Sequence, residues 1–144
     1  MRRLLIICAL AALAGCTEPQ PRLIVSVTSH ASVASQPYDQ AYAGAILCNY
    51  EVSATTTGGG KGDFAEWLDI TQRWELTGTG YVASDTITAA DAALEWGSDR
   101  IYAGQTFTEQ RGAYWSGPFT LERVYNYRLP NGHVDSTKFL LTCT

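Results

Sequence analysis

The fold is decided by residues 119–132, FTLERVYNYRLPNG, which lie near the end of this 144-residue chain. Large apolar side chains recur there with a period of two, as they do in a strand that buries one face: Phe119, Leu121, Tyr125, Tyr127 and Leu129. A Pro-Asn-Gly turn signal follows at 130–132, and residues 134–142 then return in a similar alternation. The stretch therefore predicts a β-hairpin.

Upstream of this hairpin, five segments have strand character: 23–27, 45–52, 66–77, 100–103 and 106–109. In the second segment one face carries Ile46, Cys48, Tyr50 and Val52. In the third, one face carries Leu68, Ile70, Trp74 and Leu76, and the other carries Trp67, Asp69, Arg73 and Glu75. The β-branched and aromatic residues of this third segment favour a strand.

One short helix is expected near residues 89–96. Thr88 is a suitable N-cap, and Asp91 stands three positions later, as in a capping box. The run Ala-Ala-Leu-Glu at 92–95 favours helix, and Gly97 supplies a stop.

Many short strands, frequent turns and little helix are typical of an all-β sandwich or barrel. With Cys48 on an early strand, Cys143 on a late one and tryptophans between them, residues 22–144 resemble an immunoglobulin-like β-sandwich. A small β-barrel is the alternative. The chain departs from antibody domains at Leu141, which stands where they carry the tyrosine of the tyrosine corner, and in placing Cys143 on the last predicted strand.

The first sixteen residues are typical of an exported bacterial protein. Two arginines precede an uncharged run at 4–15 whose helical length is only about 18 Å, against a hydrocarbon core of roughly 30 Å. Such a segment is read as an export signal. The last four residues, Leu13-Ala14-Gly15-Cys16, resemble the lipobox of bacterial lipoproteins. This resemblance implies a signal peptide at 1–15 and diacylglycerol on Cys16.

The same resemblance implies a lipid anchor in the cell envelope. Thr17, in place of Asp, favours the outer membrane in a host that has two membranes. Residues 16–21 form a Pro-rich tether that reaches no more than about 20 Å. The domain at 22–144 is therefore expected close to its membrane.

The net charge of the mature chain limits the classes of partner that it can bind. The signal takes two of the 10 basic residues and none of the 14 acidic ones, which leaves 8 basic against 14 acidic residues and a formal charge of −6. No basic stripe is present, so nucleic-acid binding is disfavoured. The 129 residues that remain after cleavage at residue 15 suit one domain.

The cysteines predict one disulfide bond. Cys8 leaves with the signal and Cys16 carries lipid, so Cys48 and Cys143 remain for each other in an oxidising compartment. A reactive thiol or a metal pair is the competing interpretation. Neither a C-x-x-C spacing nor a neighbouring histidine favours it.

No motif for catalysis, metal binding or a cofactor is complete, and none of these is expected. The glycine-rich stretch at 57–62 lacks the first glycine and the hydroxyl residue of a phosphate loop, and no G-x-S-x-G occurs. Two groups of acids remain: Asp63, Glu66 and Asp69, and then Glu95 and Asp99. These would serve a hydrolase only if the fold brought two carboxylates together, and solvated surface positions are the competing interpretation.

Three tryptophans are candidate ligand-binding residues: Trp67, Trp96 and Trp115. Trp67 shares its predicted face with charged residues, and the other two lie near turns. Exposed aromatic rings stack on sugars or anchor protein partners, whereas filling of the core is the competing interpretation.

The sequence therefore predicts a membrane-anchored envelope lipoprotein with a non-enzymatic immunoglobulin-like module for binding or assembly. Its expected partner, besides the membrane, is an envelope protein or a glycan. The alternatives are a glycan-binding domain that uses exposed tryptophans and a small hydrolase that uses paired carboxylates.

Overall fold

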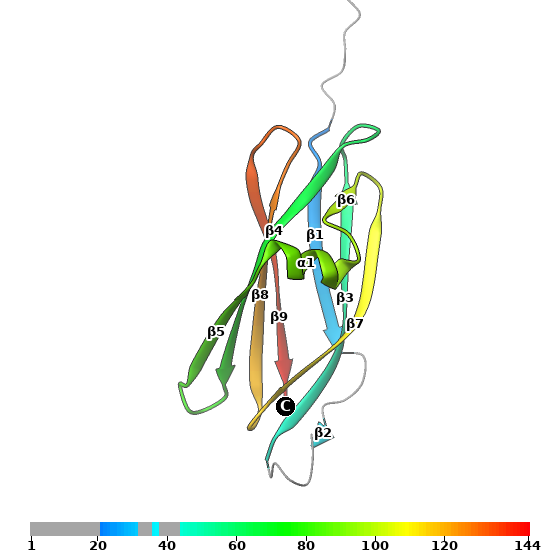
Figure 1. Cartoon of the computed structure of the whole chain (residues 1–144). Coiled ribbons are helices and arrows are strands. Elements are labelled where there is room, and N and C mark those ends of the chain that lie inside the picture. The colour runs from blue at the N-terminus through cyan, green and yellow to red at the C-terminus, as the bar shows by residue number, and fades with distance from the viewer. Residues whose placement is uncertain (1–20, 32–35, 38–43) are drawn as a thin grey trace, which may run out of the picture.

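A computed structural model describes residues 21–31, 36–37 and 44–144. The predicted signal peptide, Cys16 and the tether up to residue 20 lie outside the described residues. Within them, two antiparallel sheets face each other as an immunoglobulin-like β-sandwich with one short helix, as predicted (Figure 1). Neither sheet closes on itself, so the fold is the sandwich and not the alternative small barrel.

The first sheet is built around its central strand, β3 (Ile46–Thr57). On one side β3 pairs with β1 (Ile24–Ala31), and on the other with β7 (Thr106–Trp115). The two residues of β2 (Gln36–Pro37) also pair with β3. β7 has no other strand partner among the described residues, so it forms an edge of the sheet.

The second sheet has the order β5-β4-β8-β9. Its central strands are β4 (Phe64–Leu76) and β8 (Phe119–Arg128), and its outer strands are β5 (Val82–Ile87) and β9 (Val134–Cys143). The short β6 (Arg100–Tyr102) pairs with the start of β4. β8 and β9 form the predicted hairpin, whereas β5 was not predicted from the sequence.

The predicted face of β4 is wrong at Trp67, because the strand contains a bulge. The pairing of β4 with β8 shifts between Trp67 and Asp69. An extra residue reverses which alternate positions point inward, so Trp67 and Ile70 both face the core, at 2% and 0% exposure. Trp67 therefore does not share a face with Asp69, as a regular strand would require.

The helix α1 (Ala89–Trp96) follows the predicted capping pattern. The backbone N–H of Asp91 donates to Thr88 Oγ1 at 3.4 Å, and Thr88 Oγ1 donates to the Asp91 carboxylate at 2.8 Å. Gly97 ends the helix with φ 69°, a left-handed conformation that suits glycine. No helix in the described part of the chain is long and apolar enough to cross a membrane.

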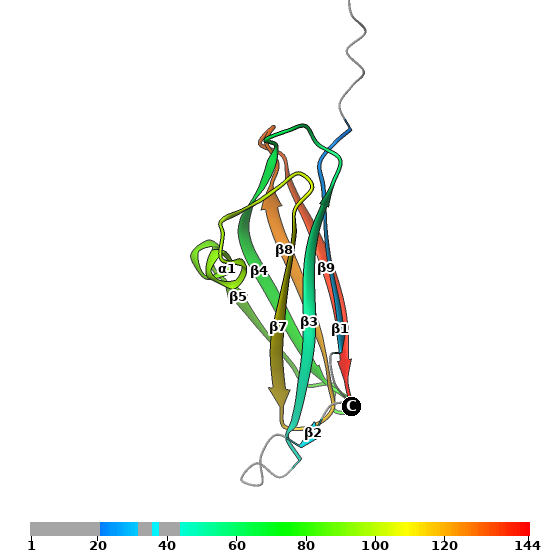
Figure 2. The same cartoon turned by 90° about the vertical axis from the view of Figure 1, so that its right-hand side faces the viewer.

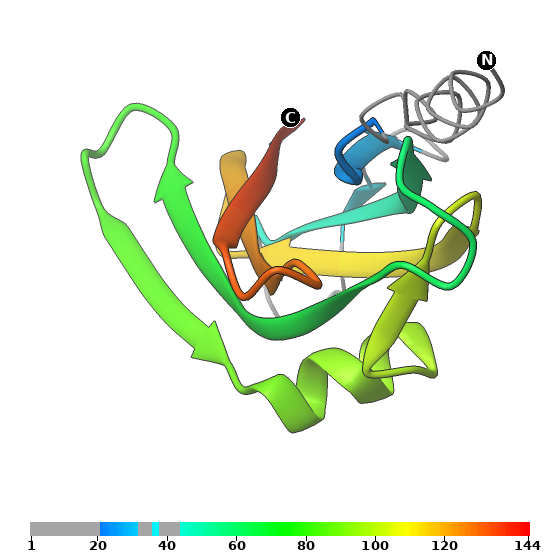
Figure 3. The ribbon, with the colours of Figure 1, turned by 90° about the horizontal axis from the view of Figure 1, so that it is seen from above.

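The two sides of the sandwich differ. On one side β1 lies beside β9 (Figure 2), where Arg22 pairs with Asp135 at 2.7 Å and the Val27 N–H donates to Thr137 Oγ1 at 3.1 Å. On the other side β5 and β7 are edge strands, and the chain between them forms α1 and β6. Figure 3 shows α1 on the side of the sandwich away from β1.

The predicted disulfide is present between Cys48 on β3 and Cys143 on β9, with Cα atoms 5.7 Å apart and a sequence separation of 95. Closing a loop of this length stabilises a fold by roughly 4–5 kcal/mol in the chain-entropy account. We expect the Cys48→Ala/Cys143→Ala variant to lose stability of that order in urea unfolding followed by circular dichroism. Reductant should lower the midpoint of the native chain but not of the variant. A urea midpoint of the native chain that is unchanged by reductant would contradict the prediction.

Candidate functional site

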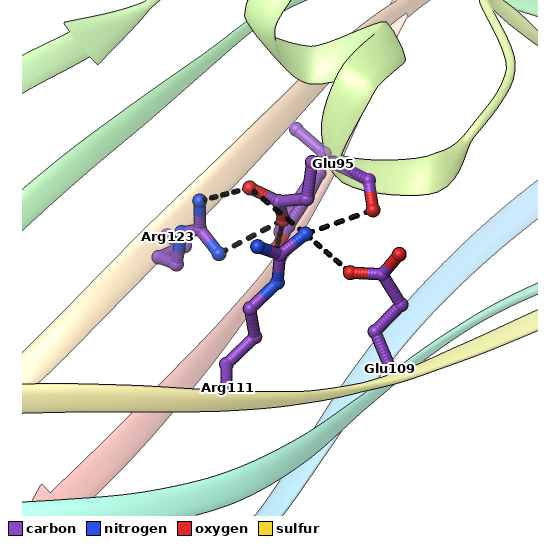
Figure 4. Close-up of polar contacts among 5 residues, drawn as sticks. Glu95, Glu109, Arg111 and Arg123 are labelled. Atoms are coloured by element: carbon purple, nitrogen blue, oxygen red, sulfur yellow. Dashed lines mark hydrogen bonds and ion pairs between the residues drawn. The ribbon is translucent and has the colours of Figure 1, made fainter.

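An ion pair is buried between the two sheets. The Arg123 guanidinium on β8 donates to both carboxylate oxygens of Glu95 on α1, at 2.9 Å and 2.7 Å (Figure 4). Both side chains are almost fully buried, at 4% and 6% exposure. The Tyr125 hydroxyl donates to the same carboxylate at 3.1 Å. The pair is therefore bidentate and has a third partner, which is the arrangement that a buried charge needs.

Local structure explains why both charges point inward. On β8 the buried positions alternate, and Arg123 occupies the one between Leu121 and Tyr125. On α1 the buried residues are Ala92, Glu95 and Trp96, whose spacing of three and four places them on one helix face. Each charge thus stands at a core position of its own element, where the opposite charge is its main stabilising partner.

A second arginine connects this pair to the edge of the first sheet. Arg111 on β7 donates from Nη2 to the backbone carbonyl of Glu95 at 2.8 Å, and the same nitrogen lies 3.8 Å from the Glu95 carboxylate. Arg111 also forms an ion pair with Glu109 two positions earlier on β7 (Figure 4). The cluster of Glu95, Glu109, Arg111 and Arg123 therefore ties α1, β7 and β8 together.

Burial shapes the electrostatics of the cluster. It raises the pKa of the Tyr125 hydroxyl, an effect that Glu95 adds to and Arg123 opposes. Burial likewise raises the pKa of Tyr50 on β3. For Arg123, burial alone lowers the pKa, but interactions with Tyr125 and Glu95 outweigh it and the pKa is raised. The tyrosines therefore stay neutral and Arg123 stays charged at ordinary pH.

A cleft of about 1160 Å³ lies beside this cluster, between the edge strand β7 and strands β4 and β8. The cleft has a polar end and an apolar end, and each end is lined by residues that lie close together on the paired strands. At the polar end Tyr50 pairs with Arg111 in the first sheet, and Gln72 pairs with Arg123 in the second. At the apolar end the lining residues are Ala45, which precedes β3, and Trp115 on β7, together with Trp74, Leu76 and Leu121 of the second sheet.

Aromatic rings meet across the sandwich at the apolar end. Trp74 on β4 stacks on Trp115 on β7, with ring centroids 5.9 Å apart and an interplanar angle of 16°. Tyr81, which precedes β5, adds a third ring 6.1 Å from Trp115 and is 57% exposed. Two stacked rings and a third, tilted and exposed ring therefore form the aromatic part of the cleft lining.

The polar end has unused hydrogen-bonding capacity. The Nε atoms of Arg111 and Arg123 are buried and have no hydrogen-bond partner within the described part of the chain. Buried polar atoms are nearly always paired. Both atoms belong to arginines that line the cleft, so its polar end contains two buried N–H donors without a partner in the described residues.

The structure places only one of the three candidate tryptophans in this cleft. Trp115 lines it, whereas Trp67 and Trp96 are buried in the core at 2% and 5% exposure. The rings of Trp67 and Trp96 stack on each other with centroids 5.8 Å apart. Core filling is thus the role of these two, because the bulge in β4 and the inner face of α1 turn them inward.

The acidic residues do not assemble into a common site. Asp63 accepts a hydrogen bond from the Gly60 N–H at 2.7 Å, and Asp69 accepts one from Asn126 at 2.6 Å. Glu66 pairs with Arg128, and Asp99 lies near Arg100. In the ranges that the structure describes, no three His, Cys, Asp or Glu residues are grouped for a metal ion.

Comparison with known proteins adds information on the fold. No protein-family model and no curated protein matches the sequence. The crystal structure of the putative ApaA protein from Bordetella pertussis matches with a TM-score of 0.59 and 20% identity, over 86% of this chain and 96% of that chain. The X-ray structure of Northeast Structural Genomics Consortium target SoR45 matches with a TM-score of 0.61 and 11% identity, over 85% and 87%. At such identities the likeness concerns the fold alone.

Breaking the buried ion pair should be costly. Glu95→Ala leaves Arg123 buried without a counter-charge, so we expect a loss of about 3–5 kcal/mol in urea unfolding. Glu122→Ala on the same strand as Arg123 is the matched control, because it removes an exposed pair with Lys138 and should cost less than about 1 kcal/mol. The double variant Glu95→Met/Arg123→Met should regain most of the loss. Equal costs for Glu95→Ala and Glu122→Ala would contradict this account.

Stability should fall at alkaline pH because of the buried tyrosines. Their folded pKa is raised above the ordinary value of 10.0, so their contribution is complete below pH 10 and is lost as pH rises through the folded pKa. For one such tyrosine, each pH unit between the unfolded pKa of 10.0 and the folded pKa lowers the unfolding free energy by about 1.4 kcal/mol. Tyr125→Phe should therefore lose less unfolding free energy between pH 8 and pH 11 than the native chain. Identical losses would show that Tyr125 ionises equally in both states.

Proposed function

We propose that this chain is a membrane-anchored envelope lipoprotein whose immunoglobulin-like domain binds a small ligand, without reacting with it, in the cleft between β4 and β7. The observation that carries the proposal is the two-ended lining of the cleft. Apolar and aromatic walls with a few convergent polar groups are the usual composition of small-molecule sites. Here the arginines supply the polar groups and the stacked tryptophans supply the apolar wall.

The scaffold supports a preformed site. Every wall residue of the polar end lies on a strand or on α1, and the buried ion pair fixes α1 against β8. Sites built on such elements hold their geometry better than sites on loops. Binding without reaction is supported by Glu95, whose carboxylate is already engaged by Arg123 and Tyr125.

The anchor part of the proposal rests on the lipobox at 13–16. Lipid on Cys16 and a tether that ends near residue 21 would keep the domain within about 20 Å of the membrane. Ligands would then be met at the membrane surface.

The cleft is testable with phenylnaphthylamine, a neutral fluorescent probe of apolar sites, added to the unlipidated full-length Cys16→Ser chain. We expect saturable enhancement of probe fluorescence that Trp115→Ala lowers at least several-fold, since the ring forms one wall. Tyr102→Ala is the control, because Tyr102 is exposed and does not line the cleft. Binding that is unchanged in Trp115→Ala would place the probe elsewhere and reject the proposed site.

The anchor is tested separately. Cys16→Ser should abolish incorporation of labelled fatty acid and move the protein from the membrane to the soluble fraction. Cys8→Ser is the matched control, since Cys8 lies within the proposed signal and should leave labelling intact. Retention of the label in Cys16→Ser would refute lipidation at that residue.

Glycan binding at the same mouth is a second candidate, because the exposed Tyr81 ring and Trp115 form a surface on which a sugar ring stacks. It predicts that cell-wall or plant glycans change tryptophan fluorescence and displace the probe. Glycans that do neither would exclude it.

A further inference from the structure

We infer that the ligand of the cleft is an amphiphile with a carboxylate head group, which takes the place of the Glu109 carboxylate on Arg111 while its apolar body lies along β7 toward Trp115. This inference rests on the proposed function of the cleft. It goes further by assigning the chemistry of each end.

The head group is indicated by the state of Arg111. The residue lines the cleft, and its side chain is 30% exposed. Its present acidic partner, Glu109, is 33% exposed and sits on an edge strand. A partly exposed pair of this kind contributes little, so an incoming anion can replace Glu109 at small cost. The buried Arg123–Glu95 pair, in contrast, stays closed.

Charge counting favours an anion with a single charge. The cluster holds two arginines and two glutamates, so it is balanced as it stands. When Glu109 turns away, Arg111 and Arg123 face Glu95 alone, and one positive charge is left over. A planar carboxylate matches both that charge and the fork of N–H donors on a guanidinium. A cationic or neutral head group would leave the charge of Arg111 without a counter-charge of its own, since Glu95 is already paired with Arg123.

The body of the ligand is indicated by the inward face of β7. Arg111, Ala113 and Trp115 are successive residues on that face and all line the cleft. Four residues of an antiparallel strand span roughly 13 Å. Leu121 on β8 also lines this path, and the stacked rings of Trp74 and Trp115 stand at its apolar end. The cleft therefore fits an elongated aliphatic or flat aromatic body of about that length with its acid at one end.

The experiment measures displacement of phenylnaphthylamine from the Cys16→Ser chain by four compounds with the same ten-carbon chain: decanoate, decanol, decyl phosphate and decyltrimethylammonium. Charge-assisted hydrogen bonds to Arg111 should make decanoate compete roughly tenfold better than decanol. Arg111→Gln should remove that advantage, so that decanoate and decanol compete equally in this variant. Glu109→Gln should strengthen the binding of decanoate, because the Glu109 carboxylate no longer competes for Arg111. The matched control Arg128→Gln, which alters an exposed pair elsewhere on β8, should change nothing.

The outcomes separate the two proposals. Equal competition by decanoate and decanol, with probe binding still dependent on Trp115, would overturn the carboxylate and leave the cleft as a binding site. Preference for decyl phosphate would overturn it in favour of a phosphate head group. The proposal predicts opposite effects of Glu109→Gln and Arg111→Gln on the binding of decanoate. Weaker binding of decanoate in both variants would therefore also overturn the carboxylate head group. Absence of probe binding would instead reject the proposed function itself.

Discussion

Removing the charges of Arg123 and Glu95 from water carries a large desolvation cost, and the fold offsets it only by holding the two groups in contact. That requirement positions α1. The helix must sit where Glu95 meets the middle of β8, and its two caps limit it to eight residues that end at Trp96. The Tyr125 hydroxyl and the Arg111 guanidinium then complete the hydrogen bonds around the carboxylate and its backbone carbonyl. One polar contact in the core thus fixes the relation between a helix, a central strand of one sheet and the edge strand of the other.

The cleft follows from the same arrangement. On the β1–β9 side the sheets are joined by a disulfide, an ion pair and a hydrogen bond from a backbone N–H to a threonine hydroxyl. On the β5–β7 side α1 lies at the level of the ion pair, and farther along the cleft Trp74 of β4 stacks on Trp115 of β7. Because the sheets are joined directly on the β1–β9 side and are separated by α1 on the other side, the cleft lies on the α1 side. The register of the strands then decides that charged residues line one end of this space and tryptophans the other.

The features predictable from sequence are those that depend on local chemistry. The helix caps at Thr88 and Gly97, the β8–β9 hairpin and the pairing of Cys48 with Cys143 all follow from short patterns or from counting. β5 was missed because an edge strand exposed on most residues carries no apolar alternation. The predicted face of Trp67 was wrong because no sequence signal marks the bulge in β4, which shifts the alternate positions that point into the core. The ion pair did leave a signal, since Arg123 and Glu95 each interrupt an apolar face, but their contact spans 28 residues and needs the tertiary structure.

The charges on the inner face of β7 have a consequence beyond ligand binding. An unpaired edge strand is a template for another chain, and charged residues that point inward from such an edge are a known protection against aggregation. A strand from a second copy that paired with β7 would have to extend the sheet beside Glu109 and Arg111, burying their ion pair further with no new partners to satisfy it. For domains crowded onto one surface by lipid anchors, as we propose, this disfavours edge-to-edge association. The same two side chains would therefore keep neighbouring copies apart and the cleft open to small molecules.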